Sequence, residues 1–277
     1  MADQINTPVE HDHVPANALV AVAGVADFWE QVCAAPHISL FLDFDGTLAP
    51  FQADRLQAFP LPGTVDALNR IIDERLASVA IVSGRPIAEI TLLMGDLETT
   101  IVGAHGYEIH NPGGVKHVVS IRPEQAAILD AAYDEAFAIF DPARVERKAA
   151  SVAVHFRGLD PRATSSIQDK LERQWRAAST TDLMEFRPFN GGLELRAAGR
   201  TKGTAIKELL AIAPDDSLPI YIGDDDTDED AFAVLESCGI GIKVGPQDAV
   251  TKAAGRVPDC ETVRQILIDW PNGRRCT

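Results

Sequence analysis

The chain has 277 residues, of which 46% are hydrophobic and 24% are charged, a balance typical of a globular protein with enough apolar material for a core. At about 150 residues per domain, this length predicts one large or two medium domains. Forty-one Asp and Glu against 25 Lys and Arg leave a formal charge of −16. Because this charge gives no positive field to attract phosphate backbones, we expect no nucleic-acid partner.

The N-terminal stretch predicts a polar tail over residues 1–25, in which His11-Asp12-His13 is a weaker candidate for metal binding. The longest apolar run, Ala18–Ala26, is well short of the roughly 20 residues that span a bilayer, and acidic residues precede it where a secretory signal is basic. We therefore expect no membrane association and a cytoplasmic protein. Its cysteines are far apart and form no CxxC pair, so all four are expected to be reduced thiols: Cys33, Cys238, Cys260 and Cys276.

Short apolar runs bounded by turn formers predict four buried parallel strands: Ile38–Phe44, Ala77–Ser83, Ile101–Gly103 and Leu218–Gly223. Helical patterns lie between them: Val65–Arg75, Ile87–Met94, Gly203–Ala211 and Glu229–Glu236. Strands that alternate with helices predict a doubly wound, Rossmann-like α/β fold. Such a sheet binds ligands at the carboxyl ends of its strands.

The middle of the chain has a different pattern, in which a helix followed by two strands occurs twice. The expected elements are Pro123–Phe140, Arg144–Ala149, Val152–Arg157, Pro161–Ala178, Asp182–Arg187 and Gly192–Arg196. This pattern predicts an antiparallel α+β unit inserted into the α/β core. We therefore place a first core segment at 26–117, a cap domain at 118–197 and a second core segment at 198–277.

Two carboxylates follow the first predicted strand in Asp43-Phe44-Asp45-Gly46-Thr47-Leu48. Side chains two residues apart on an extended chain point the same way, so Asp43 and Asp45 present both carboxylates to one site. Their repulsion must be offset by a cation or by a shared proton. A solvated Asp-Gly turn is the simpler alternative.

The segment 224–230 places six acidic residues in seven positions after the last strong strand. A helix N-terminus favours two or three acids, but hardly six. A calcium loop of the EF-hand type is excluded, because its sixth position is Glu229 where glycine is required and its twelfth is Leu235. An oxygen-rich Mg²⁺ site shared with the first Asp pair fits better.

Two further strand ends carry candidate phosphate ligands. Ser83 ends the second strand before Gly84-Arg85, and Lys202 precedes the helical segment that begins at Gly203. A lysine at this point can reach a phosphate whose other oxygens face the helix N-terminus. Each signal is weak by itself, since Ser-Gly turns and surface lysines are common.

The order and spacing of these motifs resemble the haloacid dehalogenase superfamily of phosphotransferases. Within it, the chain is similar to the trehalose-6-phosphate phosphatase family over about residues 37–260. The motifs that carry this resemblance are Leu42–Pro50, Ser83-Gly84-Arg85, Gly103-Ala104-His105-Gly106, Gly223–Glu229, and, in the insert, Glu146-x-Lys148 with His155-Phe156-Arg157 and Glu194 eight residues before Lys202.

The resemblance implies hydrolysis of trehalose 6-phosphate to trehalose and phosphate. It implies that Asp43 is the nucleophile that forms an aspartyl-phosphate and that Asp45 is the general acid and base. Four groups of residues follow from it: Asp43, Asp45 and Lys202 as catalytic residues; Thr47, Ser83, Gly84, Arg85 and Lys202 as phosphate ligands; Asp43, Asp45 (through its backbone carbonyl), Asp224 and Asp228 around Mg²⁺; and Glu146, Lys148, Arg157 and Glu194 as sugar ligands.

Two other functions remain open from the sequence. One is a capped phosphatase for another sugar phosphate, such as sucrose phosphate or mannosyl-phosphoglycerate. The other is a catalytically inactive sugar-phosphate sensor, although such a sensor has no need for the complete set of Asp, Ser and Lys motifs. The expected partner is a small-molecule substrate, and we expect a monomer.

Overall fold

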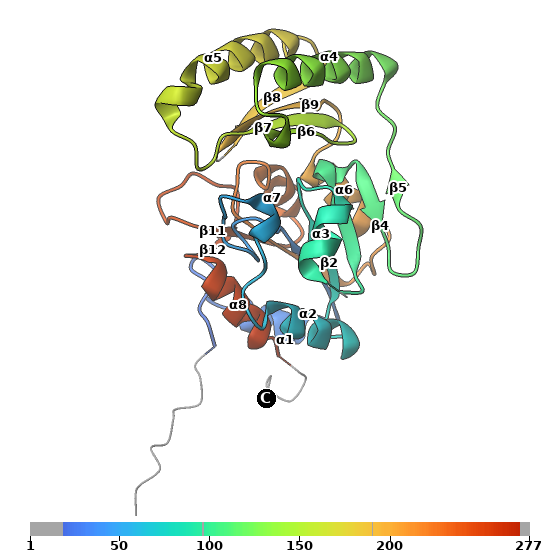
Figure 1. Ribbon diagram of the computed structural model, residues 1–277. Helices are drawn as coiled ribbons and strands as arrows, with labels where there is room; N and C mark the ends of the chain where they lie inside the picture. Colours follow the sequence, from blue (N-terminus) through green and yellow to red (C-terminus); the bar gives the residue numbers. More distant parts are fainter. Residues whose placement is uncertain (1–18, 96, 190, 272–277) are drawn as a thin grey trace, which may run out of the picture.

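The computed structural model describes residues 19–95, 97–189 and 191–271, which form two sheets that each carry their own helices (Figure 1). The strands of the larger sheet are β1 His37–Leu42, β2 Ser78–Val82, β3 Thr100–Gly103, β4 Glu108–His110, β5 His117–Val118, β10 Ser217–Gly223, β11 Ile240–Val244 and β12 Gly255–Val257. Their order is β12-β11-β10-β1-β2-β3-β4-β5. The six strands from β12 to β3 are parallel, whereas β4 pairs antiparallel with β3 and β5 pairs antiparallel with β4.

Helices cover both faces of this sheet. They are α1 Phe28–Ala34, α2 Thr64–Asp73, α3 Ile87–Met94, α6 Lys202–Leu210, α7 Glu229–Leu235 and α8 Cys260–Ile268, with the 3-10 turns η1 Arg55–Gln57 and η2 Ala104–Gly106. Because side chains alternate along a strand, Leu40 of β1 packs in the cluster that contains α2 and α8. Phe41 packs on the opposite face with α6 and α7. The predicted doubly wound α/β fold is confirmed.

The insert forms a separate layer above the carboxyl ends of the parallel strands (Figure 1). Its elements are α4 Pro123–Ile139, η3 Pro142–Arg144, β6 Val145–Arg147, β7 Ser151–His155, α5 Pro161–Ala178, β8 Met184–Phe189 and β9 Gly192–Ala197. The strands form an antiparallel sheet in the order β6-β7-β9-β8. It packs on α4 and α5 around its own apolar cluster, which includes Leu129, Trp175 and Leu195. None of the helices in the described residues has the length and hydrophobicity to cross a bilayer.

The register of the cap sheet separates its polar and apolar side chains. Glu146 pairs with Ala153, Ala153 with Glu194, and Glu194 with Arg187, so these four lie in one row across the sheet. Side chains in such a row share a face of the sheet. The neighbouring row, from Val145 to Pro188, lies on the other face. Register therefore gathers charged groups from strands that are up to about 50 residues apart in the sequence.

Several predicted elements are adjusted by the structure. The strand predicted over Arg144–Ala149 spans only Val145–Arg147, and Ser151, which was expected in the turn, begins β7. Four strands were not predicted, namely β4, β5, β11 and β12. β4, β5 and β12 are only two or three residues long and lie toward the edges of the sheet, so they carry little periodic signal.

The first core segment begins earlier than expected. Val22 and Val25 are buried in the core, and Ala23 exchanges two backbone hydrogen bonds with Arg256 of β12. The predicted tail over 1–25 is therefore wrong for residues 19–25. The reason is that this apolar run needs a partner strand more than 200 residues away. His11-Asp12-His13 lies outside the described residues.

One expectation about the cysteines is also wrong. Cys33 is disulfide-bonded, whereas Cys238 and Cys260 are free thiols. Sequence spacing cannot reveal this bond, because cysteines far apart in the chain become neighbours only through the tertiary fold.

Candidate active site

The candidate residues converge because each follows the carboxyl end of a parallel strand or begins a helix there. Asp43 comes directly after β1, and its backbone amide donates to the Ile222 carbonyl of β10 at 2.9 Å. Ser83 follows β2, and Asp224 follows β10. Lys202 is the first residue of α6, which is capped by Thr201. This is the edge at which a doubly wound sheet gathers ligands.

Lys202 is buried between two carboxylates. Its Nζ donates to Asp43 Oδ1 at 2.8 Å and to Asp228 Oδ1 at 2.7 Å, and it lies 3.9 Å from Asp225 Oδ1. Asp228 also accepts from the Tyr221 hydroxyl at 2.5 Å and from the Asp225 amide at 2.9 Å. Both oxygens of Asp228 are therefore already hydrogen-bonded. With both oxygens engaged, Asp228 is better placed to hold Lys202 and the Asp225 amide than to bind a metal ion directly.

The excess of negative charge at this point fits a divalent cation. Burial raises the pKa of Asp43 well above its ordinary value; Lys202 lowers it, and Asp228 and Asp224 raise it further. Burial, Asp225 and Asp228 raise the pKa of Asp224 to about 8. One carboxylate oxygen from each of Asp43, Asp224 and Asp228 lies within 4.8 Å of the other two. Oxygen donors of this kind suit Mg²⁺, whose charge offsets the repulsion among them.

The Asp45 side chain turns away from this cluster toward Arg85. The guanidinium of Arg85 donates from Nε and Nη2 to the two carboxylate oxygens at 2.6 and 2.7 Å. Such a two-point contact fixes the orientation of a carboxylate. Any contribution of Asp45 to a metal site therefore falls to its backbone carbonyl. The guanidinium of Arg85 is committed to protein acceptors, and its predicted contact with phosphate stays a prediction.

The other predicted phosphate ligands surround the same point. Ser83 is buried and its Oγ accepts from the Arg85 amide at 3.1 Å, while Gly84 lines the cavity beside Asp43. Thr47, four residues after Asp43, is fully buried, and its hydroxyl has no hydrogen-bond partner among the described residues. Gly46 has a φ of +76°, and a Cβ there would collide with the Asp224 carboxylate. Glycine is thus required for the close approach of the two acidic loops.

Cap and core meet in a buried polar contact at Glu194. Lys148 Nζ donates to Glu194 Oε1 at 3.0 Å and to the Gly84 carbonyl at 3.2 Å, and the Ser151 hydroxyl donates to the same carboxylate at 2.7 Å. Burial alone would raise the pKa of Glu194, but Lys148 and His105 outweigh it and hold that pKa well below its usual range. The predicted sugar ligand Lys148 therefore touches the loop that follows Ser83, and Glu194 is bonded to Lys148.

His105 joins Glu194 from the core side, with 3.1 Å between Nε2 and Oε2. It adopts a left-handed backbone with φ 56°, which non-glycine residues seldom do outside functional or strained sites. A Cβ on Gly84 would lie 2.5 Å from the His105 ring, so the glycine makes room for the histidine. The sequence singled out His105 within a motif but assigned it no role.

Glu146 and Arg157 face the core beyond this contact. Glu146 accepts from Arg55 Nη1 at 3.1 Å and pairs with His155 at 3.0 Å. Arg157 stacks over Phe51 with 4.7 Å to the ring centroid and donates to the Gln52 carbonyl at 3.1 Å. Arg55 and Phe51 were missed by the sequence, since nothing in a loop marks them as neighbours of the cap.

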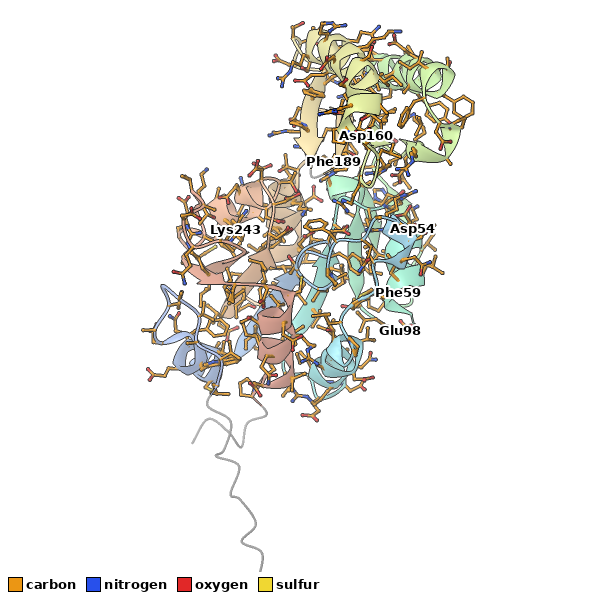
Figure 2. The ribbon with its side chains drawn as sticks, turned by 60° about the vertical axis from the view of Figure 1, so that its left-hand side comes forward. Asp54, Phe59, Glu98, Asp160, Phe189 and Lys243 are labelled. Atoms are coloured by element: carbon orange, nitrogen blue, oxygen red, sulfur yellow. The ribbon has the colours of Figure 1, made fainter. Side chains whose placement is uncertain are left out.

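A cavity of about 1170 Å³ holds most of these groups. It is lined at one end by Asp43, Asp45, Lys202 and Asp224 and at the other by Glu146, Lys148, Arg157 and Glu194, and the carbon faces of Phe51, Phe186 and Phe189 complete it. Figure 2 shows Phe189 on the side of the cap that meets the core. A disaccharide phosphate fits the size and the mixture of apolar and charged walls.

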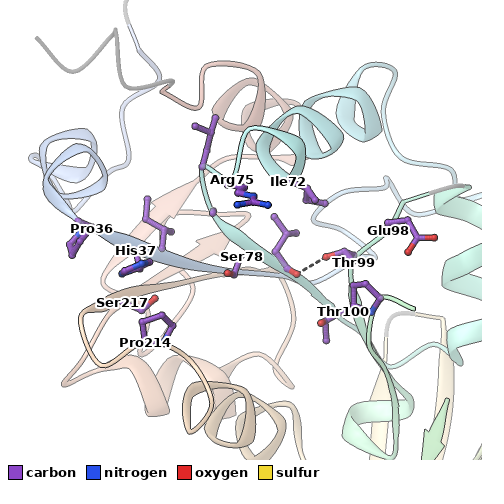
Figure 3. Close-up of a pocket in the computed structure, with 16 residues that line it drawn as sticks. Pro36, His37, Ile72, Arg75, Ser78, Glu98, Thr99, Thr100, Pro214 and Ser217 are labelled. Carbon is purple, nitrogen blue, oxygen red and sulfur yellow. Dashed lines mark hydrogen bonds between the residues drawn. The ribbon is translucent and has the colours of Figure 1, made fainter. Parts of the chain in front are cut away.

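A second cavity, of about 610 Å³, lies at the opposite edge of the sheet (Figure 3). It is lined by residues at or near the amino ends of strands, including His37, Ser78, Thr100 and Ser217, and the Thr99 hydroxyl donates to the Val79 carbonyl inside it. Asp43, Asp45, Asp224 and Lys202 line the larger cavity, together with the predicted sugar ligands of the cap. The larger cavity is therefore the candidate active site.

A model of the trehalose-phosphatase family matches residues 41–257, which is more than half of the chain and includes every residue of the candidate active site. The chain belongs to the trehalose-phosphatase family. The resemblance predicted from the motifs is thereby confirmed.

Curated relatives agree with the family. The chain is 33% identical over 208 residues to a trehalose-phosphate phosphatase of Mycolicibacterium paratuberculosis, a match that covers 72% of this chain and 51% of that protein. It is 32% identical over 220 residues to an uncharacterised glycosyl hydrolase of Mycobacterium tuberculosis, covering 74% of this chain and 16% of the other. The chain thus spans about half of the length of the first relative and about a sixth of the length of the second.

A solved structure supports the fold of the chain as a whole. The C-terminal domain of a trehalose-6-phosphate phosphatase from C. albicans superposes with a TM-score of 0.75 at 22% sequence identity, covering 92% of this chain and 99% of that one. At this identity the likeness establishes the arrangement of core and cap and no more.

The charges at the cap predict a specific loss of stability in acid. Burial would raise the pKa of Glu146, but Lys148, His155 and Arg55 lower it from 4.5 to about 2. A depressed pKa stabilises the fold fully above the unfolded value, and this stability is lost as the pH falls through the folded value. In denaturant titrations between pH 5 and pH 2, Glu146→Gln should flatten the decline in unfolding free energy by up to about 1.4 kcal/mol per pH unit, the value for one proton.

The exposed substitution Glu124→Gln is the matched control, and it should leave the slope of the parent protein unchanged. Equal slopes for the parent and for Glu146→Gln would contradict the pKa assignment.

Proposed function

We propose that this chain hydrolyses trehalose 6-phosphate to trehalose and inorganic phosphate, as a step of trehalose biosynthesis. The observation that carries the proposal is one cavity with a buried Asp43–Lys202 pair at one end and the charged row of the cap sheet at the other. The first end suits a phosphate and the second suits a polyhydroxylated, uncharged group. Membership of the trehalose-phosphatase family supports this substrate.

Asp43 is the proposed nucleophile. Its buried carboxylate attacks phosphorus, the bond to the sugar oxygen breaks, and an aspartyl-phosphate forms on Asp43. Lys202 holds Asp43 in place and faces the developing charge on the phosphoryl oxygens, with Ser83 and the amides around Gly84 as further donors. Asp45 donates a proton to the departing sugar oxygen and then takes one from the water that hydrolyses the aspartyl-phosphate.

The acidic cluster would hold Mg²⁺ through Asp43, Asp224 and the Asp45 carbonyl, with Asp228 behind them. When bound, this ion supplies positive charge that neutralises the phosphate and the carboxylates together. Lys202 supplies only one positive charge to three buried or half-buried acids within 4 Å. The single charge of Lys202 is therefore too small to neutralise a phosphate dianion in addition to these acids.

The cap residues would choose the sugar. Glu146 and Glu194 offer acceptors, and Lys148 and Arg157 offer donors, to hydroxyl groups in the cavity. A site built to pair hydroxyls rejects a molecule that lacks them, because its buried charges are then left unpaired. The monomeric state and the cytoplasmic location stay predictions from the sequence.

A panel of sugar phosphates tests the substrate. We expect the purified protein to release phosphate fastest from trehalose 6-phosphate, ahead of sucrose phosphate, mannosyl-phosphoglycerate and glucose 6-phosphate. Asp43→Asn should lower this rate by about a thousandfold or more, because an amide is a very poor nucleophile. Preference for another member of the panel would overturn the substrate, and absence of any turnover would favour the sensor.

Metal binding should release a proton near neutral pH. The pKa of Asp224 is raised to about 8, so its carboxyl is protonated below that pH and must ionise to bind a cation. The affinity for Mg²⁺ should then rise about tenfold from pH 6 to pH 7 and level off above pH 8. Calorimetry in two buffers of different ionisation enthalpy measures the proton directly, and Asp224→Asn should abolish the release. Binding that is independent of pH would contradict the assignment.

The sugar ligands should affect trehalose 6-phosphate selectively. Arg157→Met should lower kcat/KM for it roughly tenfold to a hundredfold, since a hydroxyl then loses a charged partner. The rate with p-nitrophenyl phosphate, which is too short to reach the cap, should change little. Arg176→Met is the matched control. Like Arg157, Arg176 stacks on a phenylalanine, in this case Phe186, but Arg176 does not line the cavity. Equal losses with both substrates would show that Arg157 supports the fold instead.

A further inference from the structure

Five side chains of alternating charge connect the cap to the proposed general acid. Arg55 Nη1 donates to Glu146 Oε1 of the cap at 3.1 Å and also bonds Glu89 Oε1 of α3. Arg85 Nη1 donates to Glu89 Oε2 at 3.2 Å, and the other two nitrogens of Arg85, Nε and Nη2, donate to the two carboxylate oxygens of Asp45. All five line the larger cavity. The order Glu146, Arg55, Glu89, Arg85, Asp45 is therefore one continuous series of contacts.

These contacts are shielded enough to depend on one another. The side chains of Arg85, Glu146 and Glu89 are 10%, 11% and 14% exposed, and that of Arg55 is 34% exposed. Removing one member of a poorly solvated pair leaves the other charge without compensation, which is far more costly than the loss of a surface pair. If Arg55 is lost, two carboxylates of the series lose a partner at once.

Arg55 also holds Arg85 by a second route. The backbone carbonyl of Arg55 accepts from Arg85 Nη1 at 2.8 Å. The turn η1 that carries this carbonyl is capped by the Asp54 side chain and packs against α3, and Asp54 lies on the core side of the cavity (Figure 2). The orientation of the Arg85 fork, and with it that of Asp45, is thus set by Glu89 and by the position of Arg55.

We propose that Arg55 and Glu89 are positioning residues that make the orientation of the Asp45 carboxylate depend on closure of the cap over the core. With the cap in place, Glu146 holds Arg55 against Glu89, Glu89 holds Arg85, and Arg85 orients the carboxylate that donates the proton. With the cap displaced, Arg55 loses Glu146 and the series loses its anchor. This proposal rests on the proposed role of Asp45, and it extends that role to residues that touch neither the phosphate nor the nucleophile.

The test compares two substrates that differ in their need for a proton. Phenyl phosphate expels a basic phenolate, whereas p-nitrophenolate is a stable anion that leaves with little help. The ratio kcat/KM ends at departure of the phenol, so the later hydrolysis of the aspartyl-phosphate does not enter it. Neither substrate carries a sugar, so the result is independent of sugar identity.

Glu89→Gln and Arg55→Gln should each lower kcat/KM for phenyl phosphate by about tenfold or more, and for p-nitrophenyl phosphate by less than about threefold. Glu146→Gln should act in the same direction, and when it is combined with Arg55→Gln the loss should be no greater than that of Arg55→Gln alone. Arg55→Lys, which keeps the charge on a flexible stem, should recover part of the activity. Arg147→Gln is the matched control, because it removes an ion pair of β6 with Asp130 outside the cavity lining.

The outcomes separate this proposal from the one it rests on. If Asp45→Asn itself shows no larger loss with phenyl phosphate than with p-nitrophenyl phosphate, the acid role of Asp45 fails. If Asp45→Asn shows the difference but Arg55→Gln and Glu89→Gln lower both substrates equally, or neither, the coupling is overturned and the series only holds the cap in place. Additive losses for Glu146→Gln and Arg55→Gln would overturn it as well.

Discussion

The crowding of carboxylates at one edge of the sheet is the constraint on which the rest of the site depends. Asp43, Asp224 and Asp228 are brought together by the ends of two adjacent parallel strands, β1 and β10, and the net charge of the chain gives them no relief. Lys202 offsets part of the repulsion, and its place at the first turn of α6 is what lets it reach between Asp43 and Asp228. Such a cluster is stable only with a cation or with protons, and a bound cation is what the proposed phosphate chemistry would use.

The cap has a different role in the proposed function. It would recognise a disaccharide, which has many hydroxyls and no charge, through charged groups kept from water. The antiparallel register supplies them by placing Glu146, Glu194 and Arg187 in one row, while α4 and α5 cover the other face of the sheet. Lys148 reaches the Gly84 carbonyl and Glu194 reaches His105, so the proposed sugar ligands of the cap are hydrogen-bonded to the core beside the proposed phosphate ligands. The proposed sugar site and the proposed phosphate site are thus joined by direct contact between cap and core.

Two sets of contacts therefore cross between cap and core. One runs from Glu194 and Lys148 to the loop after Ser83, where the phosphate would sit. The other runs from Glu146 through Arg55, Glu89 and Arg85 to Asp45, where the proton would move. The first suits binding of the phosphate and the second suits timing of the proton transfer. In the proposed mechanism the site is complete only when the cap makes both sets of contacts.

The sequence by itself determined the strands that precede Asp43, Ser83 and Asp224, the inserted cap and the family, because buried strands, turn residues and motif spacing are local properties of a chain. It did not determine the three short strands β4, β5 and β12, the bond at Cys33 or the early entry of residues 19–25 into the core, which depend on distant partners. The partner of Arg85 and the places of Arg55, Glu89 and His105 were also decided only by the tertiary structure. Glu146 and Arg55 are 91 positions apart, and no local pattern can show that two such side chains meet once a cap sheet is folded over a parallel one.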